Sequence, residues 1–217
     1  MKQRNIFIGA AALLVAAFIG GALFYNNLKA EQAAKVAAQN QTALVRADAP
    51  SVGKADAPVH IVEFFDPACG TCRDFYPQVK QLMDAHAGKV RLSLRYAPFH
   101  PGSDQVVKVL EAAKRQGRFE PALEALFASQ PVWVQNHTAD VALIWGPLSS
   151  VGLDMERLKY DMNLPEVAQV IARDLWDAKT LNVTQTPEYF VNGLPLPSFG
   201  FEQLKQLVED AVKRTNP

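Results

Sequence analysis

The chain contains only two cysteines, and their position constrains its fold more than any other feature. Cys69 and Cys72 follow a short apolar run, residues 59–65, which predicts a buried strand. After them, apolar residues recur at helical spacing across residues 70–87, and Gly88 is expected to end that helix. Cys69 is therefore expected near the N-terminus of a helix. Two cysteines are too few for a disulfide framework, so the pair indicates thiol chemistry.

Composition and charge narrow the class of protein. The chain has 217 residues, of which 49% are hydrophobic, enough for one core and an N-terminal appendage. Its 22 basic and 22 acidic residues give a formal net charge of zero. No run of Lys and Arg is present, so the sequence predicts no binding to nucleic acid.

The N-terminus predicts export. Lys2 and Arg4 precede an uncharged run of apolar residues and glycines, residues 6–24, which is close to the ~20 residues that cross a bilayer as a helix. The basic end is expected to stay in the cytoplasm. A cleaved signal peptide is the alternative, although its apolar stretch is usually only ~7–15 residues and is followed by small residues. Both interpretations place the body in an oxidising compartment.

The segment after the apolar run is predicted to be a tether. Glu31–Val45 is rich in good helix formers but lacks a broad apolar stripe, so it is expected to be a partly helical spacer or a self-association stalk. The predicted organisation is a membrane anchor or signal at 1–25, a tether at 26–55, a first α/β half at 56–102, a helical insertion at 103–181 and a second α/β half at 182–217.

The remaining strands follow from local patterns. Val90–Tyr96 alternates apolar and polar residues, and Glu188–Val191 leads through Asn-Gly into Leu194–Pro197, which predicts a hairpin. No strand is expected between residues 103 and 181, and Ser103 is expected to cap the first helix there. Helices are predicted over 103–116, 119–129, 138–150, 154–162, 165–181 and 201–213.

The position of Cys69 explains why it would be reactive. Free N–H groups and the dipole at a helix start favour the thiolate, so Cys69 is predicted to attack and Cys72 to resolve the mixed disulfide. Half of a zinc site is an alternative, but structural zinc takes four ligands, and the sequence has no second cysteine pair and four scattered histidines. We therefore predict no metal and no cofactor. An inert disulfide would gain little stability from so short a loop.

Two segments resemble a known family. Residues 63–72, EFFDPACGTC, resemble the active-site stretch of the DsbA-like branch of the thioredoxin superfamily, and residues 186–193, TPEYFVNG, resemble its second signature. The resemblance covers roughly residues 50–215. It implies a thioredoxin-like α/β fold with a helical insertion and a thiol–disulfide oxidoreductase activity.

The resemblance assigns the redox pair to Cys69 and Cys72. The strongly oxidising members commonly carry Pro-His between the cysteines, whereas this chain carries Gly70-Thr71. Loss of the histidine removes one stabiliser of the thiolate, which leaves the redox direction open between an oxidase, a reductase and an isomerase.

Three further residues take roles from the resemblance. Pro187 matches the family's cis-proline, and Thr186 before it is expected to present its backbone to a substrate strand. Glu63 matches a buried acid that shuttles protons for Cys72; the alternative is that Glu63 is merely paired, or is exposed on an edge strand. His100 is expected to have a capping or surface role rather than a place near the thiols.

The predicted function is dithiol–disulfide exchange, most simply as a DsbA-like oxidase. The expected partners are exported proteins that contain cysteines, a redox partner that resets the pair, and the cytoplasmic membrane through residues 6–24. The body would lie in the periplasm, anchored by one span or soluble after cleavage. A copper-handling protein or chaperone that uses the thiols as soft ligands is the alternative from another class.

Overall fold

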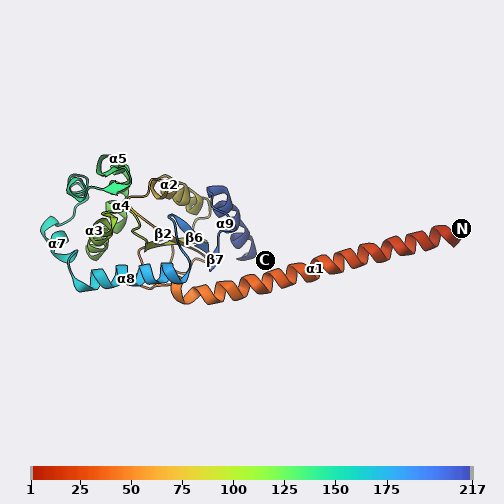
Figure 1. Ribbon diagram of the computed structural model, residues 1–217. Helices are drawn as coiled ribbons and strands as arrows, with labels where there is room; N and C mark the ends of the chain where they lie inside the picture. The colour runs from red at the N-terminus through yellow and green to blue at the C-terminus, as the bar shows by residue number, and fades with distance from the viewer. Residues whose placement is uncertain (1, 216–217) are drawn as a thin grey trace.

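The computed structural model describes the backbone of residues 2–215 and the side chains of residues 13–15 and 17–215. A single helix, α1 (Lys2–Leu44), projects from a body that contains every strand (Figure 1). Within the described residues, α1 holds a stretch long and apolar enough to cross a membrane, although a signal sequence near an N-terminus passes the same test.

The body is built on a five-stranded sheet with the order β1-β3-β2-β6-β7. Its strands are β1 (Ser51–Val52), β2 (Val59–Phe65), β3 (Val90–Tyr96), β6 (Glu188–Val191) and β7 (Leu194–Pro195). The central pair, β2 and β3, is parallel, and the other pairs are antiparallel. The three longer strands confirm the sequence prediction. β1 was not expected, because two residues between helix-breaking prolines carry no alternating pattern.

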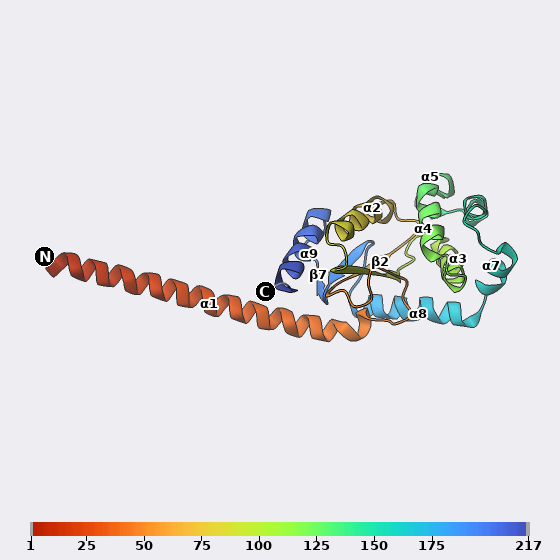
Figure 2. The ribbon, with the colours of Figure 1, turned by 180° about the vertical axis from the view of Figure 1, so that it is seen from behind.

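Helices cover both faces of the sheet. On one face lie α2 (Gly70–Ala85) and α9 (Phe201–Thr215), and on the other lies α8 (Pro165–Thr180) beside the end of α1 (Figure 2). Because side chains alternate along a strand, β2 sends Ile61 and Phe65 into the large core on the α2 side and Val62 and Phe64 into a smaller core on the α8 side. Glu63 shares the α2 side.

The predicted helical insertion is present, but the helix expected over 138–150 and the expected absence of strands between residues 103 and 181 are both wrong. Its helices are α3 (Ser103–Arg115), α4 (Phe119–Ala128), α5 (Gln130–Trp133), α6 (Trp145–Leu148) and α7 (Met155–Asp161), followed by α8. The helix predicted over 138–150 is wrong: a small hairpin of β4 (Val134–Gln135) and β5 (Thr138–Ala139) is followed by a 3-10 turn at Val141–Leu143 and α6. Asn136 and His137 adopt positive φ in that hairpin turn, which a helix does not allow.

The predicted tether is helical as far as Leu44, but its last turns pack on the body. A narrow stripe of Ala37, Asn40, Ala43 and Leu44 faces α8 and β7, and the Asn40 side chain donates to the Gly193 carbonyl at 2.9 Å. The contact between this part of α1 and the body is narrow and involves mostly small residues. For this reason, it leaves no broad apolar stripe in the sequence.

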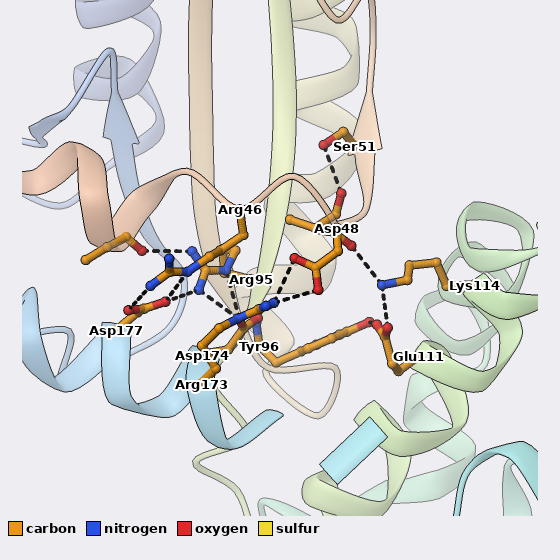
Figure 3. Close-up of polar contacts among 12 residues, drawn as sticks. Arg46, Asp48, Ser51, Arg95, Tyr96, Glu111, Lys114, Arg173, Asp174 and Asp177 are labelled. Carbon is orange, nitrogen blue, oxygen red and sulfur yellow. Dashed lines mark hydrogen bonds and ion pairs between the residues drawn. The ribbon is translucent and has the colours of Figure 1, made fainter. Parts of the chain in front are cut away.

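A buried ion network connects that helix end to the sheet (Figure 3). The Arg95 guanidinium donates to the Ala43 and Leu44 carbonyls, both at 2.9 Å, and to the carboxylates of Asp174 and Asp177 on α8. Helix C-terminal carbonyls lack partners within the helix, so Arg95 satisfies them. The end of α1 is therefore part of the folded body.

Candidate active site

Both cysteines lie where the sequence placed them, at the C-terminal end of β2 and the start of α2. Cys69 is the residue before the first helical residue, and Cys72 lies in the first turn. Both are free thiols and both are buried, Cys69 at 6% exposure and Cys72 at 0%. Gly70 and Thr71 lie between them at the surface of the first turn.

The two thiols have opposite electrostatics. Hydrogen bonding from the Cys72 side chain is the largest influence on Cys69, and with the N–H groups of Cys72 and Thr71 it lowers the Cys69 pKa to about 5 despite burial. Burial raises the pKa of Cys72 well above its usual value, and neighbouring Cys69 and Glu63 add to that rise. At neutral pH, Cys69 is the thiolate and Cys72 retains its proton.

Glu63 lies inside the core, not on an exposed edge. Its side chain is 1% exposed, and burial raises its pKa to about 8. Tyr189 is its cross-strand partner in the pairing of β2 with β6. Neither Oε2 of Glu63 nor the Tyr189 hydroxyl has a hydrogen-bond partner within the described residues. A carboxyl group with a pKa raised this far is protonated at neutral pH more than an exposed one.

The loop before β6 meets the first cysteine. The Cys69 sulfur lies 3.2 Å from the Thr186 carbonyl oxygen, across 117 positions of sequence, and donates to it when the thiol is protonated. The Thr186–Pro187 peptide bond is cis, as the resemblance implied. The structure therefore brings together Cys69, Cys72, Thr186 and Pro187, with Glu63 on the strand beneath them.

Sequence reasoning missed the residues that shape the loop between β2 and α2. Asp66 is fully buried, and its Oδ1 accepts the Ala68 N–H at 2.8 Å. Its Oδ2 accepts the backbone N–H of His100 at 2.8 Å, lies 2.8 Å from His100 Nδ1, and accepts the Ser103 hydroxyl at 3.1 Å. Buried Gln130 donates to the Cys69 carbonyl at 3.0 Å. No periodicity could reveal these contacts between distant residues.

Two expectations about this region are wrong. Ser103 is the first residue of α3 and donates to Asp66 and the His100 carbonyl, so it does not cap the helix. His100 does not have only a capping or surface role, because it is bound to buried Asp66 and lines the same cavity as Cys69. Gly102, whose φ of 81° suits glycine, turns the chain between them.

An open cavity of about 560 Å³ lies over Cys69. Its walls come from the start of α2, the β3–α3 connection, the β4–β5 turn and the loop before Pro187. They are formed by Cys69, Gly70, Thr71, Asp74, Phe99, His100, His137, Thr184, Gln185 and Thr186. This depression is open, and it is more polar than the apolar depression described below, which suits a peptide chain better than a small enclosed ligand.

A more apolar depression of about 610 Å³ lies along α2 and α4, lined among others by Tyr76, Pro77 and Phe127. It contains neither cysteine, so we place the reactive site at the polar cavity. Within the part of the chain described, no group of three or more His, Cys, Asp or Glu side chains could hold a metal ion.

The comparisons with known proteins agree with this geometry. A family model described as Thioredoxin matches residues 45–210. The chain belongs to this thioredoxin family, and it is similar to several named relatives.

One such relative is disulfide bond formation protein D of Bacillus subtilis, 28% identical over 173 residues, which are 76% of this chain and 77% of that protein. The Na(+)/H(+) antiporter NhaA of Herminiimonas arsenicoxydans is 30% identical over 141 residues, 65% of this chain. The chain spans only 22% of that antiporter's length.

Among solved structures, a thioredoxin-like oxidoreductase from Silicibacter pomeroyi superposes with a TM-score of 0.68 at 32% identity. The similarity covers 81% of this chain and 96% of that one. The predicted fold, a thioredoxin-like α/β domain with inserted helices, is therefore confirmed.

Proposed function

We propose that this protein is a DsbA-like thiol–disulfide oxidoreductase that oxidises cysteine-containing exported proteins through Cys69 and Cys72. The observation that carries the proposal is the asymmetry of the two thiols, with a lowered pKa at Cys69 and a raised pKa at Cys72. A stabilised Cys69 thiolate stabilises the reduced pair, which makes the disulfide a stronger oxidant.

The proposed reaction has two exchanges. A substrate thiolate attacks Sγ of Cys69 in the Cys69–Cys72 disulfide, a mixed disulfide forms, and Cys72 leaves as a thiolate. Glu63, which holds a proton near neutral pH, protonates Cys72. A second substrate thiolate then attacks the substrate sulfur of the mixed disulfide, and Cys69 leaves as a stable thiolate.

Thr186 and Pro187 complete the proposed site. The Thr186 carbonyl lies at hydrogen-bond distance from Cys69, so its backbone is placed to pair with an extended substrate segment in the polar cavity. Gly70 and Thr71 border the same cavity and leave Cys69 accessible from above.

We also propose that α1 anchors the body on the outer face of the cytoplasmic membrane, with residues 6–24 in the bilayer. The supporting observation is that the end of α1 is packed on the body, whereas its apolar part projects away from it (Figure 1). A membrane-bound or soluble redox partner must then reoxidise Cys72 and Cys69 after each turnover. A soluble periplasmic form after signal cleavage is the alternative.

The test is disulfide transfer from the oxidised full-length protein in detergent to a reduced peptide with two cysteines. We expect Cys69→Ser to abolish transfer. Cys72→Ser cannot form the internal disulfide, so it is mixed instead with the oxidised peptide, whose disulfide Cys69 attacks; we expect a mixed disulfide on Cys69 and a free peptide thiol, visible by mass spectrometry. The assignment would be wrong if Cys69→Ser still transferred disulfides, or if Cys72→Ser formed no mixed disulfide on Cys69. Tight copper binding lost in Cys69→Ser, with no transfer by the wild type, would favour the copper-handling alternative.

The reduction potential of the Cys69–Cys72 pair, measured by equilibrating the same protein in glutathione buffers, distinguishes an oxidase from a reductase. An oxidase is expected to have a reduction potential toward the DsbA value, roughly −120 mV, because the Cys69 thiolate is stabilised. A potential toward the thioredoxin value, roughly −270 mV, would contradict oxidation and indicate a reductase.

A further inference from the structure

Asp66 holds a histidine at the edge of the active-site cavity. Oδ2 of Asp66 lies 2.8 Å from Nδ1 of His100 and also accepts the backbone N–H of that residue. A carboxylate oxygen can only accept, so Nδ1 is the donor and carries the proton. The fixed tautomer leaves Nε2 of a neutral imidazole with a free lone pair.

The same histidine and the reactive Cys69 thiol line one cavity. His100 and Cys69 both line it, and the His100 side chain retains 22% exposure, so solvent and substrate reach it. Its backbone is also fixed, because Gly102 turns the chain and Ser103 binds both Asp66 and the His100 carbonyl. A histidine with one nitrogen bound to a buried carboxylate and the ring open to a reactive site is suited to acid–base work.

Other charged or titratable groups face this histidine from the surrounding elements. Asp66 comes from the β2–α2 loop, Cys69 and Asp74 from α2, and His137 from the β4–β5 turn, where its ring stacks on His100 at 5.8 Å. Of the two histidines, only His100 is bound to a carboxylate. His137 is part of that cavity wall, so the control histidine is His86, the residue that ends α2 and lies outside the cavity lining.

We propose that His100, oriented by Asp66, is the base that takes the proton from the incoming substrate thiol. This inference rests on the proposed exchange reaction. Nε2 accepts the proton as the substrate sulfur attacks Cys69, the S–S bond to Cys72 breaks, and its electron pair stays on Cys72. The imidazolium then lies beside the site where Cys69 later leaves as a thiolate, and it releases the proton to solvent.

The role fits a chain that has Gly70-Thr71 between its cysteines. No histidine lies within that dipeptide, and a histidine from the β3–α3 connection reaches the same cavity instead. Cysteine thiols have an ordinary pKa of about 8.5, so only a few per cent are ionised at pH 7. A base at this position raises the reactive fraction, and its advantage must shrink as the substrate thiols ionise by themselves.

The test compares His100→Asn with His86→Asn in the oxidised full-length protein. Asn keeps a side-chain N–H for Asp66 but cannot take a proton. We expect His100→Asn to slow single-turnover transfer to a two-cysteine peptide about tenfold at pH 7 and less than about twofold at pH 9, where the peptide thiols are mostly ionised. His86→Asn is expected to change neither rate by more than about twofold.

The pH dependence separates the outcomes. An equal loss at both pH values would show a structural effect on the loop and overturn the proposal, as would no loss at pH 7. Recovery at pH 9 shows in the same sample that the variant is folded. Asp66→Asn, in which an amide group replaces one acceptor oxygen, should give the same recovery if Asp66 acts through His100. Failure of the wild type to transfer at any pH would instead reject the proposed function.

Discussion

The two faces of the central sheet bury polar groups in different ways. On the α8 side, Arg95 donates to Asp174, Asp177 and the last carbonyls of α1, so each partner is hydrogen-bonded (Figure 3). On the α2 side, Glu63 and Tyr189 face each other across β2 and β6, and each has an oxygen without a hydrogen-bond partner in the described residues.

The difference separates stability from reactivity. A fully paired buried charge keeps its protonation state across the physiological range and fixes one segment against another. An unpaired buried acid destabilises the fold when it ionises, and its pKa moves toward neutral pH, where it can exchange a proton. The first arrangement attaches α1 to the body, and the second lies beneath the cysteines.

The largest expected effect is the loss of Arg95. Arg95→Met leaves Asp174 and Asp177 buried without their shared partner, and we expect unfolding to become easier by about 3–5 kcal/mol. Urea unfolding of the full-length protein in detergent, followed by tryptophan fluorescence, measures it. Arg46→Met is the control, because Arg46 is partly exposed and pairs only with Asp177. A loss below about 1 kcal/mol would mean that the network stabilises little.

The contrast also explains what the sequence could predict. Strands β2 and β3 and helix α2 follow from local apolar spacing, and the cysteine pair follows from its position between them. The alternation in β3 correctly predicted that Arg95 and Leu94 point to opposite faces of the sheet. The partners of Arg95, however, lie 79 and 82 positions away in the sequence. The contact of Asp66 with His100 is likewise long-range, so local patterns could identify the thiols but not the groups that orient them.

The second prediction concerns Glu63 on the active-site side, where removal of a buried charge is expected to stabilise the protein at pH 7. The Glu63 pKa is about 8 in the folded protein and near 4.5 when unfolded, so the folded state binds the proton more tightly. Stability from this group is therefore fully present below about pH 4.5 and is lost as pH rises toward 8. Glu63→Gln removes that loss and should stabilise the protein at pH 7 by at most about 3 kcal/mol.

Urea unfolding at pH 4 and pH 7 checks this sign. The gain should vanish at pH 4, and disulfide transfer by Glu63→Gln should be slower at pH 7 because Cys72 loses its proton donor. Asp177→Asn tests the opposite shift on the other face. Burial raises the Asp177 pKa, but Arg46 and Arg95 lower it by a larger amount, so the net shift is downward. Its variant should lose stability at pH 7. If both variants were destabilised equally at pH 7, the distinction between the two faces would fail.

The smallest expected effect lies at the exposed margin of the ion network. Asp48 accepts two hydrogen bonds from Arg173, at 2.8 and 2.9 Å, but the two side chains are 46% and 35% exposed. Water and salt screen such a pair, so Asp48→Ala should cost about 0.2–1 kcal/mol, and the cost should fall further in 1 M salt. Urea unfolding at low and high salt measures it. If Asp48→Ala cost as much as Arg95→Met, the strength of these ion pairs would not depend on their burial.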